Sequence, residues 1–336
     1  MRIAYMFSGL GSLSGKTNGI LTQALTWACE LRKIGVEVDL ISPWDGYDFS
    51  ACDIVHFFSY GAAQEVGFAQ LKNKFNVRIA ISPIIDTNRS AWKSRMASML
   101  HFPMLHSYSL MGSLRASRQW VDGWFVRSEY EGEHISHALN IPTDKIFKVM
   151  LSTRLPVVDK VVQRQSFCLL VCFLPSARKN VMRLIDAAIK YGFNLKLAGS
   201  RENEAAYEKM LKKIEGHDNI EVLGRVSDAE LLSLYRTARV FALPSLMEGV
   251  GLVALEAAAN GCDIVLTNRG APKEYYNGMA TLVDPLSVDQ IGQAVMEFLG
   301  GKTYQPNLKE HIAANYTSSR AATELKMTYQ RILSDK

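Results

Sequence analysis

Two glutamates stand eight positions apart in the segment LPSLMEGVGLVALEAAANG, residues 243–261. Glu248 follows an apolar strand pattern, and Glu256 lies in a run of good helix formers that Gly261 ends. Because a helix rises ~1.5 Å per residue, the two carboxylates are separated by roughly 12 Å or less. That separation suits two carboxylates that accept hydrogen bonds from hydroxyl groups of one extended ligand.

The residues between the two glutamates predict a phosphate site. Gly249 and Gly251 stand at the start of the predicted helix, where glycines let a ligand approach the backbone closely. Unpaired amide groups and the helix dipole favour an anion at this end of a helix. The segment therefore predicts a pyrophosphate at the helix start with a carboxylate on each side.

A second glycine-rich stretch, FSGLGSLSGKTNGI at residues 7–20, lies where a phosphate-binding loop is expected. The P-loop pattern needs a glycine where Leu10 stands, and the dinucleotide pattern needs one where Ser14 stands. Both patterns are incomplete. Asp86, at the end of a later strand pattern, is the residue that best supports a nucleotide triphosphatase, because it is similar to a Walker B aspartate.

Length and composition indicate a globular protein of two domains. The 336 residues suit two cores of roughly 150 residues each, and the hydrophobic share of 48% is ordinary. No apolar run approaches ~20 residues, and a strand pattern stands where a signal peptide would begin, so we expect a cytoplasmic chain. Cys168 and Cys172 lie in the apolar FCLLVCF and are expected to be buried, reduced thiols. The net charge of +5 does not imply nucleic acid.

Strand and helix patterns alternate twice along the chain. The first series contains RIAYMF, ILTQALTWACELRKIG, VEVDLISP, DIVHFFS and VRIAISPI, and a second series starts at SFCLLVCFLP after the polar STRLPVVDKVVQRQ. This alternation predicts two α/β halves with doubly wound parallel sheets. Ligands of such sheets bind beyond the carboxyl ends of strands, so we expect a cleft between the halves. His56 ends a strand pattern and either lines this cleft or packs inside its domain.

Residues 87–127 differ in composition from the rest of the first half. They are rich in Met, Trp, Leu and Phe, and Asp122 stands against six cations, Arg89, Lys93, Arg95, Arg115, Arg118 and Arg127. This composition is typical of an amphipathic basic surface. The segment either packs helices with solvated outer faces or contacts an anionic membrane.

The spacing of the two glutamates resembles the glutamate, seven residues, glutamate motif of the family-four retaining glycosyltransferases. The likeness is almost continuous from NIEVLGRVSDAELL to MATLVDP and ends in the family's signature Val283-Asp284-Pro285. In the first half NGI, DIVHFFS and VRSEYE are similar to landmarks of the family. The resemblance covers most of the chain, specifically in the second half and loosely in the first.

The resemblance implies a fold and a domain division. Members have the GT-B fold, an α/β architecture of two facing Rossmann-like doubly wound domains with an interdomain cleft. Residues 1–155 would form the acceptor-binding domain and residues 163–317 the nucleotide-sugar-binding domain. A C-terminal helix at about 318–336 would pack back on the first domain. Closure of the two domains over the donor is expected.

The resemblance also implies roles for individual residues. Glu248 would contact hydroxyls of the transferred sugar, Glu256 the ribose hydroxyls, and Lys179 would neutralise the diphosphate. Asp86, at the end of its strand pattern, would position the acceptor. Further donor contacts would come from Gly19, Arg225, Val226 and the backbone of Gly249, Val250 and Gly251. Neither a metal nor a cofactor is expected, since the lysine and the amide groups would stabilise the leaving diphosphate.

One position departs from the family pattern. The family places an arginine five residues before the lysine, and here Leu174 stands there. Arg178, beside Lys179, or Arg201, after LAGS, could replace that charge. Loss of such a group can cost ~10²-fold in rate, which would weaken activity or change the pose of the donor.

The sequence therefore predicts a retaining, metal-independent glycosyltransferase that moves a sugar from a nucleotide-sugar donor to a glycan, polysaccharide precursor or glycolipid. The predicted partners include an anionic membrane at its cytoplasmic face and exclude nucleic acid. Two alternatives stay open. One is a non-catalytic protein of the same fold that binds nucleotide sugars or glycans, and the other is a sugar-nucleotide epimerase.

Overall fold

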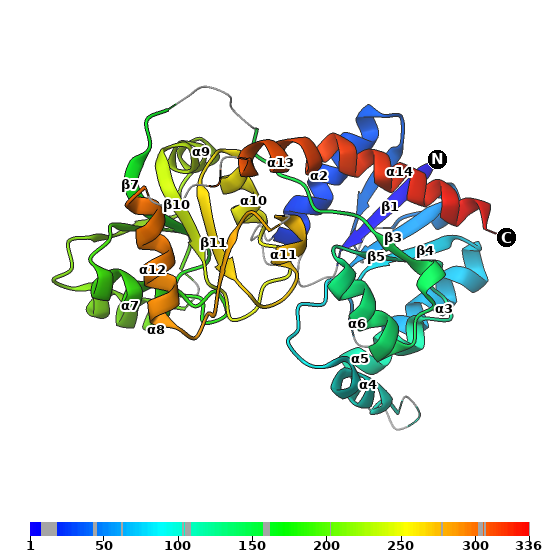
Figure 1. Ribbon diagram of the computed structural model, residues 1–336. Helices are drawn as coiled ribbons and strands as arrows, with labels where there is room; N and C mark the ends of the chain where they lie inside the picture. Colours follow the sequence, from blue (N-terminus) through cyan, green and yellow to red (C-terminus); the bar gives the residue numbers. More distant parts are fainter. Residues whose placement is uncertain are drawn as a thin grey trace. The chain divides into compact units, whose positions relative to one another are not determined.

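The computed structural model describes residues 1–7, 19–42, 46–61, 63–102, 104, 109–156, 162–201, 203–276, 278–301, 305 and 307–335. Contacts between residues divide the chain into two compact units (Figure 1). Unit 1 contains Met1–Ile85, Arg89–Arg154 and Ser318–Lys336, and unit 2 contains Asp86–Asn88 and Leu155–Thr317. Most of the glycine-rich loop, residues 8–18, and residues 157–161 of the polar connection lie outside the described residues.

Unit 1 is built on a six-stranded parallel sheet in the order β2-β1-β3-β4-β5-β6. Its strands are β1 (Arg2–Phe7), β2 (Glu37–Ile41), β3 (Ile54–Phe58), β4 (Arg78–Ser82), β5 (Gly123–Val126) and β6 (Ile146–Lys148). All four residues of β5 are buried, as expected for a parallel strand that is covered on both faces. The order reverses between β1 and β3, which makes this a doubly wound sheet.

Helices cover both faces of this sheet. They are α2 (Gly19–Lys33), α3 (Gln64–Phe75), α4 (Ala91–Met99), α5 (Leu110–Ser117), α6 (Glu129–Leu139) and α14 (Ser318–Ser334), with short 3-10 turns at Phe49–Ala51 and Thr143–Lys145. α2 and α14 pack together, whereas α3, α5 and α6 lie over the opposite face (Figure 1). The C-terminal helix α14 is thus part of unit 1, although all of unit 2 after Asn88 separates it from the rest of unit 1 in sequence.

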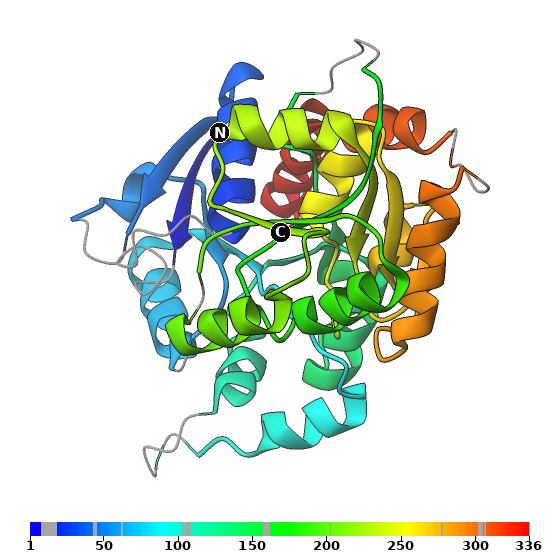
Figure 2. The same ribbon diagram turned by 90° about the vertical axis from the view of Figure 1, so that its left-hand side faces the viewer.

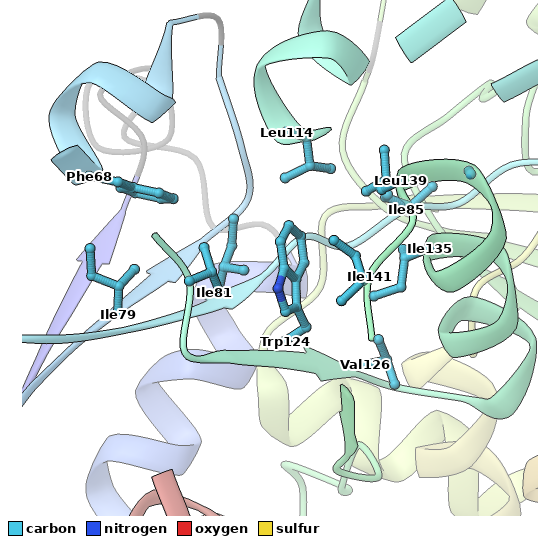
Figure 3. Close-up of a cluster of buried hydrophobic side chains, with 12 residues drawn as sticks. Phe68, Ile79, Ile81, Ile85, Leu114, Trp124, Val126, Ile135, Leu139 and Ile141 are labelled. Atoms are coloured by element: carbon cyan, nitrogen blue, oxygen red, sulfur yellow. The ribbon is translucent and has the colours of Figure 1, made fainter. Parts of the chain in front are cut away.

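A tryptophan lies at the centre of the core beneath α3, α5 and α6. Trp124 of β5 is fully buried and shares one apolar cluster with Phe68, Ile81, Leu114 and Ile135 (Figure 3). These side chains come from three helices and the middle of the sheet, so removal of the indole would leave a large cavity. The core therefore holds β4 and β5 and their following loops in one arrangement.

A buried chain of hydrogen bonds attaches α14 to the other face. The hydroxyl of Tyr329 lies 3.0 Å from that of Tyr5 and 2.6 Å from Nδ1 of His56, whose Nε2 lies 2.9 Å from Oγ of Ser82. A neutral imidazole has one donor and one acceptor nitrogen, so His56 can satisfy both neighbours. Burial lowers the pKa of His56 to about 3. His56 therefore packs inside unit 1 as a neutral residue and does not line a ligand site.

This burial predicts a pH dependence of stability. The unfolded chain binds a proton at an ordinary histidine pKa near 6.5, whereas folded unit 1 does not until about pH 3. The contribution of neutral His56 to the free energy of unfolding is therefore complete above pH 6.5. It is lost as the pH falls toward 3, by up to ~1.4 kcal/mol per pH unit. We expect His56→Gln to be less stable at pH 7 but to lose less stability on acidification.

Urea unfolding at several pH values, followed by tryptophan fluorescence, measures the pH dependence of the stability of unit 1. All five tryptophans fall within residues 27–124 and so report on this unit. The control is His137→Gln on the exposed face of α6, which should keep the wild-type slope. Equal slopes for wild type and His56→Gln would show that His56 is not held neutral.

Unit 2 repeats the architecture with a sheet in the order β12-β11-β10-β7-β8-β9, also parallel throughout. The strands are β7 (Gln165–Val171), β8 (Leu195–Ala198), β9 (Ile220–Gly224), β10 (Ala238–Leu243), β11 (Asp263–Thr267) and β12 (Thr281–Val283). The helices are α7 (Val181–Tyr191), α8 (Glu204–Ile214), α9 (Asp228–Thr237), α10 (Leu252–Ala259), α11 (Pro272–Tyr275), α12 (Val288–Leu299) and α13 (Leu308–Asn315). α7, α8 and α12 lie on one face and α9 on the other (Figure 2).

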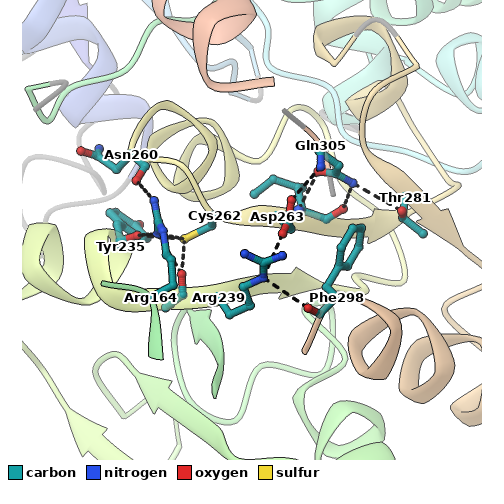
Figure 4. A network of polar contacts seen from close by, with 11 residues as sticks. Arg164, Tyr235, Arg239, Asn260, Cys262, Asp263, Thr281, Phe298 and Gln305 are labelled. Carbon is teal, nitrogen blue, oxygen red and sulfur yellow. Dashed lines mark hydrogen bonds and ion pairs between the residues drawn. The ribbon is translucent and has the colours of Figure 1, made fainter. Parts of the chain in front are cut away.

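Arg164 joins the amino ends of three strands of this sheet. Its guanidinium donates to the carbonyls of Tyr235, Ala238 and Asn260 at 2.8, 2.9 and 2.5 Å, and contacts Sγ of Cys262 (Figure 4). Burial raises the pKa of Cys262 to about 12, so the thiol stays protonated. This network closes the edge of the sheet opposite to its carboxyl ends. Within the described part of the chain, no helix is long and apolar enough to cross a bilayer.

Candidate functional site

The carboxyl ends of β7 and β10 carry the two charged residues that the structure brings together. The strand order of unit 2 reverses between these neighbours, so their following loops turn away to opposite faces. Lys179 lies in the loop after β7, and Glu248 lies in the loop after β10. The amide of Leu246 donates to the carbonyl of Arg178 at 2.9 Å, which joins the two loops directly.

Lys179 and Glu248 form a largely buried ion pair. Nζ of Lys179 lies 2.5 Å from Oε2 of Glu248, and the two side chains are only 16% and 6% exposed. Oγ of Ser245 donates to the same carboxylate oxygen at 3.0 Å. A buried charge without a partner is costly, so these three groups must be positioned together when unit 2 folds.

Asn180 fixes the backbone at the start of α7. It has a left-handed conformation, with φ of 60°, and is buried. Its side-chain amide donates to the carbonyls of Pro244 and Pro285 at 2.9 and 2.6 Å. One side chain therefore ties the loop of Lys179 to the loops that follow β10 and β12. Nothing in the spacing of the sequence marked this asparagine, although Asn and Asp tolerate the left-handed conformation better than other non-glycine residues.

The glycines predicted to approach a phosphate surround the start of α10. Gly251 has a φ of +81° and precedes the helix, and no side chain of the described residues caps it. Val250 beside it is buried. The first amide groups of a helix have no partners inside the helix, so this end offers donors and a positive dipole to an anion.

Gly270 is needed for the position of Glu248. The two residues form an isolated parallel bridge, and a Cβ at Gly270 would lie 2.0 Å from the carbonyl oxygen of Glu248. Its φ of +86° is also unfavourable for other residues. The loop after β11 thus packs against the backbone of the glutamate itself.

Glu256 lies in the second turn of α10 and is 5% exposed. The hydroxyl of Tyr235 on α9 is 3.5 Å from its Oε2. The two glutamates of the sequence motif are therefore both buried carboxylates, one in the loop before α10 and one in the helix.

Asp86 begins the short segment Asp86–Asn88, which belongs to unit 2 although the chain before and after it belongs to unit 1. Its carboxylate lies 3.6 Å from the guanidinium of Arg178, and both side chains are partly exposed. Two residues on, the side-chain amide of Asn88 donates to the carbonyl of Leu246 at 2.9 Å. The segment Asp86–Asn88 thus contacts both loops that hold the ion pair.

The remaining predicted residues are spread over other strand ends. Arg201 follows β8, where Nη1 lies 2.7 Å from Oε1 of Glu204 and the guanidinium lies 4.8 Å above the ring of Tyr207. Arg225 and Val226 follow β9. Gly19 begins α2 in unit 1. Arg201 and Arg225 therefore share the carboxyl edge of the unit 2 sheet with Lys179 and Glu248, without a described contact to the ion pair.

Leu174 has no positive charge to replace that of the arginine which the resemblance predicts at this position. It is fully buried, and its amide donates to the carbonyl of Ser200 at 2.8 Å. Its backbone is paired with that of Arg201 in an isolated bridge. The backbone of Arg201 therefore lies beside Leu174, the position that departs from the family pattern. Arg178 instead lies on the same loop as Lys179.

Tyr276 was missed by the sequence reasoning. It follows α11, is 1% exposed, and its hydroxyl has no hydrogen-bond partner among the described residues. Burial, and then the nearby charge of Glu248, raise its pKa well above the usual range. An unpaired buried hydroxyl near the carboxylate is a polar group that a ligand could satisfy. Among the described residues, no group of three or more His, Cys, Asp or Glu side chains could hold a metal ion.

Residues 174–316 match the family described as glycosyl transferases group 1. This segment is similar to the group 1 glycosyltransferases. It contains the ion pair, all of α10 and every strand of unit 2 after β7. The family that the sequence motif predicted is thus confirmed for the part of the chain that carries the site.

Curated relatives of the group 1 segment include two mannosyltransferases. O-antigen chain mannosyltransferase B of Escherichia coli is 28% identical over 192 residues, which is 51% of this chain and 50% of that protein. The GDP-mannose-dependent alpha-(1-6)-phosphatidylinositol monomannoside mannosyltransferase of Mycobacterium tuberculosis is 30% identical over 151 residues, which is 42% of this chain and 37% of that protein. The chain thus spans half or less of the length of these relatives.

A solved structure matches the chain over its whole length. Sucrose-phosphate synthase from Thermosynechococcus elongatus superposes with a TM-score of 0.77 at 15% identity, covering 100% of both chains. With the two parallel sheets, this likeness confirms the predicted GT-B fold class.

The buried ion pair makes a direct prediction about stability. Lys179→Met leaves the charge of Glu248 without its partner, so we expect unit 2 to lose about 3 kcal/mol of stability. Adding Glu248→Gln to Lys179→Met removes the unpaired charge, so the double variant should regain part of the lost stability. We expect a coupling free energy of about 1–3 kcal/mol between the two substitutions. Hydrogen exchange at the amides of β7 and β10 measures the stability of unit 2.

The matched control is the exposed pair Lys190–Asp289, with Nζ 2.5 Å from Oδ1 at the surface of the same unit. Lys190→Met with Asp289→Asn should show a much smaller coupling, since solvent screens that pair. Additive effects of Lys179→Met and Glu248→Gln would contradict the interpretation of the site.

Proposed function

We propose that this group 1 glycosyltransferase moves a sugar from a nucleotide-sugar donor to a glycan or lipid-linked acceptor. The observation that carries the proposal is the buried pair Lys179–Glu248 beside the uncapped start of α10, inside the segment that matches the family. This arrangement supplies a cation and amide donors for a diphosphate and a carboxylate for sugar hydroxyls, within one loop cluster.

The proposed chemistry concentrates on the departing diphosphate. The bond from the anomeric carbon to the diphosphate oxygen breaks, and a bond to the acceptor oxygen forms on the same face, which retains the configuration. The acceptor proton passes to the diphosphate oxygen. Lys179 and the amide groups of Gly251 and its neighbours would stabilise the negative charge that develops there. In this scheme the protein needs no metal ion and no cofactor.

Glu248 and Lys179 would therefore exchange partners during the reaction. Without a donor, each neutralises the other. With a donor bound, the ammonium would share its charge with the diphosphate, and the carboxylate would accept hydrogen bonds from sugar hydroxyls. Glu256, whose carboxylate contacts Tyr235, would accept from the ribose hydroxyls.

The other predicted residues receive supporting roles in this proposal. Arg178 and Asp86 form an ion pair beside the loop of Lys179, so Asp86 could position an acceptor and Arg178 could add positive charge near the donor. Arg225 and Val226 would border the base. Arg201 is the proposed replacement for the arginine absent at Leu174, and it would have to leave Glu204 to reach a phosphate. Gly19 stays a prediction for the donor phosphates.

The names of the relatives suggest where to begin with substrates. The two curated relatives described above are mannosyltransferases, and the name of the second includes GDP-mannose. We therefore propose GDP-mannose as the first donor to test. The names also include an O-antigen chain and a phosphatidylinositol monomannoside, which supports a polysaccharide precursor or a glycolipid as the acceptor. Peripheral contact with an anionic membrane on the cytoplasmic face is part of the same proposal.

The burial of Leu174 favours one other function. Without a cation at that position, the site could bind a nucleotide sugar and not transfer it. Product analysis separates the possibilities. A transferase forms a new glycoside with an acceptor, an epimerase changes the donor without an acceptor, and a binding protein does neither.

Replacement of Glu248 tests the proposed role of the site. Glu248→Gln keeps the size of the side chain and removes the charge, so we expect the rate of sugar transfer to fall by ~10²-fold or more. Transfer is measured with the donor that the wild-type protein accepts, and hydrogen exchange of the β10 amides verifies that unit 2 is folded.

Glu221→Gln is the control variant. Glu221 lies on the edge strand β9, is exposed and pairs with Lys196 at 2.8 Å. This variant should transfer sugar at the wild-type rate. If folded Glu248→Gln were as active as Glu221→Gln, the assignment of this site to catalysis would be wrong.

A further inference from the structure

Helix α4 of unit 1 has its large apolar side chains on the outside. Trp92, Met96 and Met99 are spaced by four and three residues and so share one face of the helix. They are 64%, 56% and 44% exposed, whereas Ser94 and Ser98 are buried. A surface helix normally packs its apolar face inward and leaves its polar face in water. α4 has the reverse distribution.

Contacts with neighbouring helices fix this orientation. α4 packs against α5 and α6, at the lower edge of Figure 1. Oγ of Ser98 lies 2.7 Å from the carbonyl of Arg95 and 3.3 Å from that of Ala138, and Nη1 of Arg115 donates to it at 3.4 Å. The serine face is therefore the packed face of α4, and the apolar face is left for another partner.

The exposed apolar surface continues after the helix. Leu100 is 64% exposed and Phe102 is 51% exposed. We call Trp92, Met96, Met99, Leu100 and Phe102 the α4 patch. Single exposed apolar residues are ordinary, but five large ones within eleven residues form a group of the kind that marks an interaction surface.

Positive charge accompanies the α4 patch. Residues 87–121 contain no Asp or Glu. Arg89, Lys93 and Arg95 are exposed, and Nζ of Lys93 lies 5.9 Å from the centroid of the Trp92 ring. Burial, and then the charges of Arg118 and Arg95, lower the pKa of Arg115 on the adjacent α5. Cations therefore gather beside the apolar side chains.

These two properties together select the partner. A second copy of the chain would bring the same cations against each other across a symmetric contact, which is unfavourable. A nucleic acid backbone would satisfy the cations and leave the apolar face in water. An anionic bilayer offers phosphates and acyl chains within the depth of one helix.

We propose that the α4 patch docks unit 1 on an anionic lipid bilayer. The face of Trp92, Met96 and Met99 enters the boundary between headgroups and acyl chains, and Lys93, Arg95 and Arg89 contact lipid phosphates. Docking depends on the described side chains of α4 and not on catalysis. The proposal gives a surface to the membrane contact of the proposed function, and only its corollary, a lipid-linked acceptor, depends on sugar transfer.

Vesicle sedimentation tests the proposal with the intact chain. The vesicles contain 70% phosphatidylcholine with 30% phosphatidylglycerol, and pure phosphatidylcholine serves for comparison. We expect binding to the anionic vesicles that weakens with salt. The triple variant Trp92→Ser, Met96→Ser, Met99→Ser should reduce the partition coefficient by ~10-fold or more, and Lys93→Glu with Arg95→Glu should do the same. All five side chains are exposed, so both variants should fold.

Matched variants on other elements control for loss of apolar area and charge. Leu211→Ser with Met296→Ser and Met327→Ser changes three exposed apolar side chains on α8, α12 and α14, and Lys209→Glu with Lys212→Glu reverses two charges on α8. Both should bind vesicles like the wild type. No preference of the wild type for anionic vesicles would overturn the proposal. Self-association that the α4 triple variant abolishes would identify a second copy as the partner instead. No sugar transfer is measured, so failure of the proposed activity leaves this result unaffected.

Discussion

The ion pair between Lys179 and Glu248 is the interaction on which the site depends. Two opposite charges, 16% and 6% exposed, are stable inside a protein only when each has the other within reach. The reversal of strand order between β7 and β10 places the two loops side by side, and Asn180 and Gly270 hold their backbones there. For the same reason we expect the site to respond to a phosphate ligand, because a diphosphate that attracts the ammonium would change the balance of charge around the glutamate.

The two units solve the same folding problem with different connections. Each buries a parallel sheet between helices, and each joins segments far apart in sequence through polar groups that are buried or partly buried. In unit 1 Tyr329 reaches His56 and Tyr5 from the C-terminal helix, and in unit 2 Arg164 binds carbonyls at the amino ends of the strands. Water cannot replace such hydrogen bonds inside the protein. They therefore favour one arrangement of the helices and strands over others that apolar packing alone would also allow. α4 is the exception, since its polar side is packed and its apolar side is exposed.

The sequence predicted the features that follow from short-range patterns. Alternating strands and helices indicated two doubly wound sheets, and Glu248, Gly251 and Glu256 marked the loop and helix of the site. Contacts between residues far apart in sequence were not accessible in this way. No local spacing shows that Asn180 donates a hydrogen bond to Pro285, or that His56 contacts Tyr329, which lies 273 residues later. The inversion of α4 was also hidden, since the composition of residues 87–127 allowed either packed helices or an exposed basic surface. The role of Arg201 at the place of Leu174 stays a prediction.

Calorimetric titration of the intact chain with nucleotide sugars tests the central claim most directly. GDP-mannose comes first, followed by UDP-, ADP-, CMP- and dTDP-sugars, with magnesium ATP for comparison. The account predicts that one sugar nucleotide binds without added metal and that Lys179→Met weakens its affinity by ~10-fold or more, since a charged hydrogen bond to phosphate contributes about 1.5–3 kcal/mol. Preferential binding of magnesium ATP, or sugar-nucleotide binding that Lys179→Met leaves unchanged, would contradict the account.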